Sequence, residues 1–281
     1  MERNDLRKIY LETMQIAMKG CYTACDGTEV VMPSTKAMIE GTRFYTERLD
    51  AGSVPCRENP TGIDVMNMDS IKCGRKLLDE GMNPVVLNMA NRHFPGGGVL
   101  NGSRAQEESL FRSTNLFLSL YRFNKTYASL CKLETAAQQY PMPQEFGGIY
   151  VPNATVFREG IDNDFALLPH PYALSFVSVA AISNPTLTEN GMLTEDAIYL
   201  TKEKMRTILR IGLLNGHDCI VLGAFGCGAF HNPPRHIARL FHEVIEEKEF
   251  KDKYHKIAFA ILDDSNAPKG GNFRPFEEEF A

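Results

Sequence analysis

Two apolar segments of the chain, residues 85–90 (VVLNMA) and 218–225 (DCIVLGAF), each lead into a glycine-rich loop and then into a helix-like pattern. The first loop has three consecutive glycines at 96–98, and the second has the sequence GCGAF at 226–230. Alternation of strands, loops and helices is the building pattern of α/β folds. The sequence therefore indicates an α/β sheet that is covered by helices on both faces.

The same alternation continues along most of the chain. Residues 20–62 are richer in glycine, proline and polar residues and are expected to form a mixed lead-in segment. We therefore expect an N-terminal helical extension of residues 1–60 and a main domain of residues 61–281, which together form one compact unit. Hydrophobic periodicity predicts helices at 2–18, 70–81, 106–123, 195–214 and 234–248, and further strands at 63–68, 149–157, 173–182 and 256–264.

Composition limits the possible partners. The chain has 281 residues, of which 43% are hydrophobic, and this is enough for a full core. The formal net charge of −5 gives no basic face for duplex DNA. The N-terminus lacks the apolar region of a signal peptide, and the longest near-apolar run, 172–182, is too short to span a bilayer. We therefore expect neither duplex DNA nor a membrane as a partner.

The cysteines indicate a reducing compartment. There are seven of them, with scattered spacing and no CxxC pair, which fits a reduced, cytoplasmic protein. A zinc site is the alternative, but its cysteines are not tightly paired and no histidine precedes His93. The candidate ligands of that alternative site are Cys21, Cys25, Cys56 and Cys73.

The two glycine loops together favour a ligand site. Ligands of open α/β sheets collect beyond the carboxyl ends of strands, and glycine lets backbone N–H groups come close to a phosphate. Two such loops could hold a diphosphate between them. Neither loop is a Walker loop or a dinucleotide fingerprint. The alternative for each loop alone is a tight turn that needs glycine.

An acidic pair, Glu107 and Glu108, follows the first loop directly after Gln106. Adjacent side chains on a helix diverge by about 100°, so the two carboxylates cannot flank one bond as the pair of an ordinary glycosidase does. We therefore expect different tasks, with one carboxyl acting as acid and base. Such an acid needs a raised pKa, whereas a helix N-terminus acts against one. The alternative is ordinary acidic charge in a first helical turn.

The motif GGG, followed by seven residues and then QEE, resembles the signature of poly(ADP-ribose) glycohydrolase catalytic domains. Residues 87–117, 149–159 and 222–234 resemble segments of the microbial branch of that family. The resemblance implies a macrodomain-like fold, a mixed sheet sandwiched between helices with ADP-ribose bound in a surface cleft. It also implies hydrolysis of ribose–ribose O-glycosidic bonds through an oxocarbenium-like transition state. Poly(ADP-ribose) or ADP-ribosylated proteins would be the substrate and ADP-ribose the product, without a metal or cofactor.

The resemblance also assigns roles to individual residues. Glu108 would be the catalytic acid and base, and Glu107 would hold the hydroxyls of the neighbouring ribose. The first loop would line the pyrophosphate and distal ribose, and the second would surround the diphosphate, with Phe230 against ribose or adenine. The implied substrate-binding residues are Asn91, Gly96, Gly97, Gly98, Gln106, Gly223, Phe225, Gly226, Gly228 and Phe230.

Several alternatives remain open at the level of sequence. The chain could be a reader that binds ADP-ribose without cleaving it, although an intact QEE argues against this, or a hydrolase of another ADP-ribose adduct on protein or nucleic acid. The chain lacks room for a large accessory domain, so we expect cleavage at chain ends. Individual residues also keep a structural alternative: His93, Phe225, Cys227, His231 and the pair at 263–264.

Overall fold

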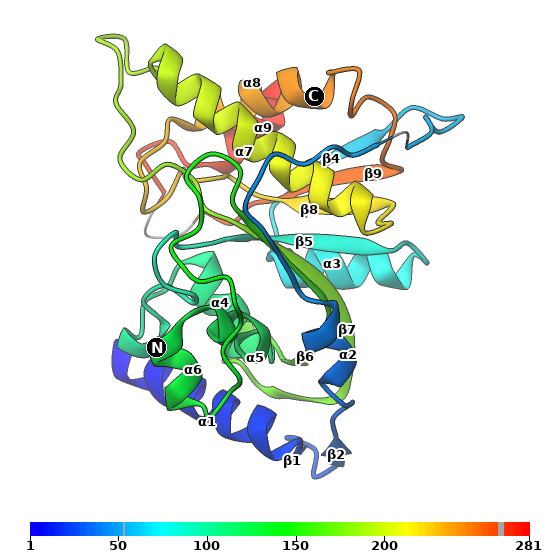
Figure 1. Ribbon diagram of the computed structural model, residues 1–281, viewed down its shortest axis with the longest axis vertical. Coiled ribbons are helices and arrows are strands. Elements are labelled where there is room, and N and C mark those ends of the chain that lie inside the picture. The colour runs from blue at the N-terminus through cyan, green and yellow to red at the C-terminus, as the bar shows by residue number, and fades with distance from the viewer. Residues whose placement is uncertain (53, 264–266) are drawn as a thin grey trace. The chain divides into compact units, whose positions relative to one another are not determined.

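The computed structural model describes residues 1–52, 54–263 and 267–281. Its described strands form a small two-stranded sheet, β1-β2, and a seven-stranded mixed sheet in the order β3-β6-β7-β5-β8-β9-β4 (Figure 1). The chain divides into two compact units, each assembled from three stretches of sequence. Unit 1 comprises Met1–Phe44, Ala90–Met142 and Ile149–Phe176, and unit 2 comprises Tyr45–Met89, Pro143–Gly148 and Val177–Ala281.

The elements alternate as expected for an α/β chain. Unit 1 contains α1 (Arg3–Lys19), β1 (Cys21–Thr23), β2 (Glu29–Val31), α2 (Lys36–Gly41), η1 (Val99–Asn101), α4 (Gln106–Ser113), α5 (Phe117–Leu120), η2 (Tyr121–Phe123), α6 (Lys125–Leu130) and η3 (Ile161–Asn163). Unit 2 contains β4 (Gly62–Met66), α3 (Ser70–Asp79), β5 (Pro84–Met89), α7 (Glu195–Leu214), β8 (Cys219–Leu222), α8 (Pro234–Ile245), β9 (Lys256–Ala260) and α9 (Phe273–Glu279). The division falls within β3 (Arg43–Tyr45), β6 (Gly148–Arg158) and β7 (Leu167–Val179).

The core of unit 2 is a parallel sheet. Strand β5 pairs with β8, β8 with β9, and β9 with β4, all in parallel. Helix α3 lies on one face of these strands and α7 on the other (Figure 1). Residues such as Val85, Ile220 and Ile257 are fully buried. A parallel sheet that is covered on both faces requires such continuous apolar strands, which is why 85–90 and 218–225 were recognisable in the sequence.

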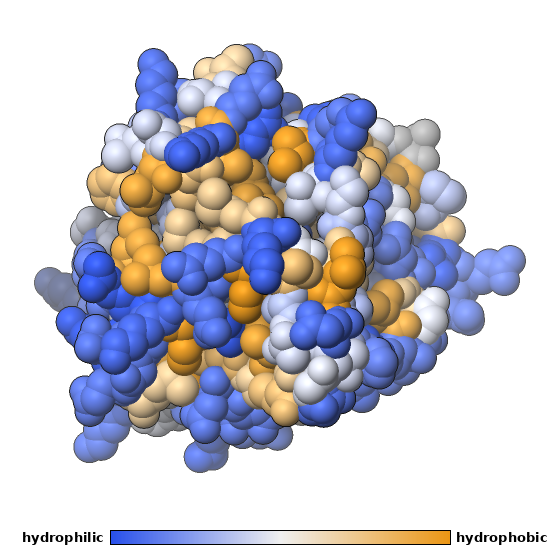
Figure 2. Space-filling view, turned by 90° about the horizontal axis from the view of Figure 1, so that it is seen from below, coloured by the Kyte–Doolittle hydropathy of each residue, from blue (hydrophilic) through white to orange (hydrophobic). Residues whose placement is uncertain are grey.

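Unit 1 begins with a long amphipathic helix. A reciprocal capping box between Glu2 and Asp5 starts α1, and Gly20, with a φ of 78°, ends it. Leu6, Tyr10 and Met14 recur at a spacing of four residues and are buried. The Tyr10 ring contacts Phe111 and Phe117 at centroid distances of 6.3 Å. Figure 2 shows the face that lies at the bottom of Figure 1, where hydrophilic and apolar residues are interspersed.

The α/β fold with a mixed sheet between helices and a helical N-terminus is confirmed. The helices expected at 2–18 and 195–214 match α1 and α7 closely. The boundary between an extension of residues 1–60 and a domain of residues 61–281 stays a prediction.

The prediction of one continuous helix at 106–123 was wrong. The helix ends at Ser113, because Thr114 adopts an extended backbone and forms an isolated bridge with Val156. The Thr114 hydroxyl donates to the Leu110 carbonyl and accepts the N–H of Leu116, which satisfies groups that the broken helix leaves open. The apolar spacing persists through the break, so periodicity alone could not reveal it.

Other boundaries differ by a few residues. The cap of α3 is Asp69 rather than the expected Ser70, and its carboxylate accepts the N–H groups of Ile71 and Lys72. Strand β7 starts at Leu167, earlier than predicted, and β8 ends at Leu222 because the next residues belong to the loop. The end of the strand expected at 256–264, with Asp264, lies outside the described residues.

Candidate functional site

The first glycine loop, residues 91–98, follows β5 and belongs to unit 1. Asn91 starts it as a turn residue, since its Oδ1 accepts the N–H groups of His93 and Phe94 at 2.8 and 3.0 Å. The loop continues into η1, and Gln106, which is partly exposed, opens α4. The loop and the two predicted catalytic glutamates therefore lie in one unit.

Both carboxylate oxygens of Glu107 bind backbone of this loop. Oε2 accepts the N–H of Asn91 at 2.8 Å, and Oε1 accepts the N–H of Gly96 at 3.0 Å. The side chain is 3% exposed. Charged acceptors of this kind form strong hydrogen bonds. Glu107 therefore fixes both ends of the turn that carries the glycines.

Glu108 has a different environment, although it is the next residue. Its Oε1 accepts the N–H of Gly98 at 2.8 Å. Its Oε2 is buried and has no hydrogen-bond partner among the described residues. A buried polar atom without a partner is unfavourable and calls for a functional explanation. Glu108 is thus held by one oxygen, while the other is buried without a partner among the described residues.

Glycine at 97 is required by the closeness of these carboxylates. Gly97 has a φ of +51°, and a Cβ at this position would lie 2.6 Å from Glu108 Oε1 and 3.1 Å from Glu107 Oε2. A larger residue would displace the Glu108 carboxylate and crowd that of Glu107. The N–H of Gly97 donates to the Phe94 carbonyl, so all three glycines of the motif donate their N–H groups within unit 1. The pyrophosphate contact expected of these glycines stays a prediction.

Tyrosines surround Glu107. Burial raises the pKa values of Tyr121, Tyr127 and Tyr140, and the negative charge of Glu107 raises them further. The Tyr121 ring stacks on Tyr127 at 4.7 Å and its hydroxyl accepts from Tyr10 at 2.6 Å. The three tyrosines are therefore neutral and lie close enough to Glu107 for its charge to act on them.

The second glycine loop, residues 223–230, follows β8 and belongs to unit 2. The parallel pairing of β5 and β8 brings their carboxyl ends to one edge of the sheet, and Met89 lies against Gly223 there. Cys227 donates its N–H to the Ala224 carbonyl, whereas the backbone N–H groups of Gly226, Gly228, Ala229 and Phe230 have no hydrogen-bond partner within the described part of the chain. In contrast to the first loop, this loop keeps N–H groups that an anion can use.

Asn232 shapes the second loop, and the sequence analysis missed it. It is 3% exposed, and its Nδ2 lies 2.8 Å from the Ile182 carbonyl, 3.0 Å from that of Gly226 and 3.3 Å from that of Phe230. Gly226, with a φ of +75°, lets this amide approach, because a Cβ there would lie 2.5 Å from it. The only signal in the sequence is an Asn before two prolines, a common turn pattern.

Two residues of the second loop are part of the core. Phe225 is 1% exposed and packs edge-on against Phe241 of α8, so of the two alternatives for this ring the structure has burial. Cys227 is buried, and burial raises the pKa of its thiol, which is unfavourable for a nucleophile. Phe230 is partly exposed, and Gly223 is buried at the end of β8.

Other features of the described residues do not indicate a different functional site. Among the described residues, no group of three or more His, Cys, Asp or Glu side chains could hold a metal ion. No described helix has an apolar stretch of the length needed to cross a bilayer. A cavity of about 670 Å³ in unit 1 lies between α2, η2 and residues 134–138, and no predicted site residue lines it.

A family model described as the microbial-type PARG catalytic domain, where PARG is poly(ADP-ribose) glycohydrolase, matches residues 11–159. Among curated protein sequences, none matches the chain. The poly(ADP-ribose) glycohydrolase from Thermomonospora curvata is 28% identical with a TM-score of 0.83, and the match covers 99% of this chain and 100% of that one.

Two ligand complexes are also similar to the chain. The Thermomonospora curvata enzyme bound to the inhibitor ADP-HPD is 27% identical with a TM-score of 0.80, over 99% of this chain and 100% of that one. The poly(ADP-ribose) glycohydrolase from Deinococcus radiodurans in complex with ADP-ribose is 26% identical with a TM-score of 0.68, over 89% and 98% of the two chains. The similarity therefore extends over nearly the whole chain.

Proposed function

The chain belongs to the family of microbial-type poly(ADP-ribose) glycohydrolase catalytic domains, and from this membership we propose that it releases ADP-ribose by acid and base catalysis at a single residue, Glu108. The observation that carries the proposal is the buried Glu108 Oε2, which no other described group occupies while Oε1 is fixed by Gly98. A carboxyl held in this way can meet a substrate oxygen without losing a protein contact.

The reaction proceeds in two steps at one carboxyl group. Glu108 first donates its proton to the ribose hydroxyl that leaves, and the C1–O bond breaks to give an oxocarbenium-like centre. The carboxylate then takes a proton from a water molecule, whose oxygen bonds to C1. Glu108 regains its proton, and no second carboxylate is needed. Glu107 has both oxygens on backbone N–H groups and serves to hold the loop in place.

The second glycine loop is suited to the diphosphate of ADP-ribose. Its N–H groups at Gly226, Gly228, Ala229 and Phe230 have no partner among the described residues, and successive N–H groups favour phosphate oxygens. Phe230 is partly exposed and can contact ribose or adenine. The substrate is then poly(ADP-ribose), free or attached to modified proteins.

Glu108→Gln tests the proposal. Glutamine keeps an acceptor for Gly98 but cannot donate a carboxyl proton, so we expect the rate of ADP-ribose release from poly(ADP-ribose) to fall by about 100-fold or more. ADP-ribose binding, measured by calorimetry, should persist in the variant. Full activity of E108Q would overturn the assignment of the acid. A parent protein that binds ADP-ribose and releases none would indicate a reader or an enzyme for another adduct.

A further inference from the structure

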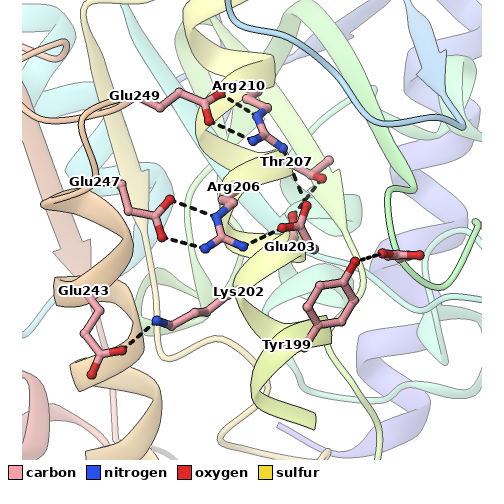
Figure 3. A network of polar contacts seen from close by, with 10 residues as sticks. Tyr199, Lys202, Glu203, Arg206, Thr207, Arg210, Glu243, Glu247 and Glu249 are labelled. Atoms are coloured by element: carbon pink, nitrogen blue, oxygen red, sulfur yellow. Dashed lines mark hydrogen bonds and ion pairs between the residues drawn. The ribbon is translucent and has the colours of Figure 1, made fainter. Parts of the chain in front are cut away.

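Arg112 is a buried arginine that forms no ion pair among the described residues. It lies on α4, one helical turn after Glu108, and is 1% exposed. A buried guanidinium is unfavourable unless its charge and donors are satisfied. Arg210, the other fully buried arginine, is held by Glu249 and Glu203 (Figure 3). The burial of Arg112 therefore needs a different explanation.

The guanidinium of Arg112 closes a ring of hydrogen bonds that contains Glu108. Its Nη2 donates to the Ser103 carbonyl at 2.6 Å. The Ser103 N–H donates to the Gly98 carbonyl at 3.2 Å, and the Gly98 N–H donates to Glu108 Oε1 at 2.8 Å. Three hydrogen bonds therefore connect the arginine to the Glu108 carboxyl. Because Arg112 and Glu108 belong to the same helix, these three hydrogen bonds and the helix backbone close a ring.

The same residue fastens helix α1 to this ring through its side chain and its backbone carbonyl. Arg112 Nε donates to the Leu6 carbonyl at 3.1 Å, and the Thr13 hydroxyl donates to the Arg112 carbonyl at 2.7 Å. Both partners are buried residues of α1. The rigid fork of a guanidinium allows it to bind two carbonyls on different elements at once, which a lysine cannot reproduce.

The positive charge of Arg112 acts on Glu108 without occupying its lone pairs. Burial lowers the pKa of Arg112 to about 10, and the charge of Glu108 acts in the opposite direction. The two charges therefore interact, but the donors of the guanidinium point to carbonyls of Leu6 and Ser103. As a result, Glu108 Oε2 still has no partner among the described residues, although the charge of Arg112 acts on the same side chain.

We propose that Arg112 is a positioning residue of the glycohydrolase reaction, which holds Glu108 through the ring of hydrogen bonds and is itself anchored by Leu6 of α1. The proposal rests on the proposed function, in which Glu108 is the acid. It gives the N-terminal helix a task that family membership does not assign. A displaced Glu108 would still leave ADP-ribose free to bind, so the expected defect lies in turnover.

The test compares Arg112→Met and Arg112→Lys with a matched control, Arg158→Met. Arg158 is also a buried arginine of unit 1 that binds α1, through Glu12 at 2.7 Å, but its other contact is the Phe165 carbonyl. The kcat and KM for ADP-ribose release, the Kd for ADP-ribose and the melting temperature are measured for each. E108Q is measured in parallel.

We expect R112M to lower kcat by about tenfold to 100-fold, as for a misplaced catalytic group, with KM and the Kd for ADP-ribose nearly unchanged. R112K should recover part of the loss, because it keeps the charge and one carbonyl contact. R158M should lower the melting temperature and keep kcat. An unchanged kcat in R112M, or a loss of kcat in R158M as large as that in R112M, would overturn the proposal. Activity of E108Q would instead overturn the proposed function, so the two failures are distinguishable.

Discussion

Glu107 and Glu108 show how one position along a helix separates two tasks. Neighbouring side chains on a helix point about 100° apart. The Glu107 carboxylate therefore accepts N–H groups of Asn91 and Gly96, whereas the Glu108 carboxylate accepts that of Gly98. Glu107 has a loop contact on each oxygen, whereas Glu108 has one on Oε1 only. The loop thereby depends on the first acid for its shape, whereas the second is the acid to which we assign the proposed chemistry.

Glu107→Gln should destabilise the loop. A glutamine has one acceptor oxygen, so the N–H of either Asn91 or Gly96 faces an NH2 group, and an unsatisfied buried donor costs about 1–3 kcal/mol. Urea unfolding should show a loss of this size, and calorimetry should show weaker ADP-ribose binding. E108Q is the matched control, since its amide keeps the Gly98 contact and should retain parental stability. Equal stability of E107Q and E108Q would contradict this division of tasks.

The sequence draws attention to Glu107 and Glu108 more readily than to the residues that support them. GGG and QEE were recognised by their resemblance to a family motif, and the roles of the two acids stay a prediction. Arg112 could not be identified, because a basic residue in the last turn of a helix is an ordinary feature. Its partners are the carbonyls of Leu6 and Ser103, and backbone carbonyls carry no sequence signature. Asn232 was missed for the same reason.

At the scale of elements, α7 is joined to α8 and the turn after it by a chain of ion pairs (Figure 3). Arg210 makes a two-point contact with Glu249 at 2.6 and 2.8 Å, and Arg206 makes another with Glu247 at 2.8 and 2.6 Å. Glu203, which is buried, lies between the two arginines. Such two-point pairs fix orientation as well as distance.

Arg210→Met should destabilise unit 2 substantially. The change leaves Glu203 with one cation and Glu249 with none at this contact. Breaking a buried ion pair reduces the free energy of unfolding by about 3 kcal/mol. Solvent screening of the partly exposed Glu249 makes the loss smaller. Arg239→Met is the control, because Arg239 pairs with Glu243 at the surface, where such pairs contribute about 0.5 kcal/mol. Urea unfolding of both variants measures the difference. Similar losses would show that burial does not strengthen this network.

Periodicity identifies elements that pack through one face or are buried on both. Helix α7 matches its expected range, and β5 and β8 were found as apolar runs. The break at Thr114 was not predictable, because it depends on a bridge to Val156, which is distant in sequence. The short elements between 20 and 62 were equally inaccessible, since strands of three residues such as β1 and β3 are too short for a period to show.

At the scale of the whole molecule, stability should depend on pH through buried His236. Its Nδ1 accepts the N–H of Leu193 at 3.0 Å, which requires that nitrogen to be unprotonated. Burial lowers the pKa of His236, the Arg239 charge lowers it further, and Glu243 opposes the shift. The unfolded chain then binds a proton more readily, so stability is complete above the ordinary pKa of about 6.5 and is lost as pH falls below it.

His236→Asn should reduce this dependence, because the amide oxygen can accept the Leu193 N–H and does not titrate. The free energy of unfolding in urea, measured at about pH 7.5 and about pH 5.5, should fall less for H236N than for the parent. An equal fall in both proteins would assign the dependence to other groups, of which buried His217, with a lowered pKa, is the first to examine.

The division of the chain into units has a consequence for its synthesis. A ribosome that has completed Phe176 has delivered every residue of unit 1, while unit 2 still lacks Val177–Ala281. In the finished sheet β8 and β9 stand between β5 and β4, so β5 waits for about half the chain and β4 for about two-thirds of it to be translated before their parallel partners exist. Nascent β4 and β5 therefore present unpaired edges for roughly ten seconds or more at ordinary elongation rates, the interval in which chaperones act on such chains.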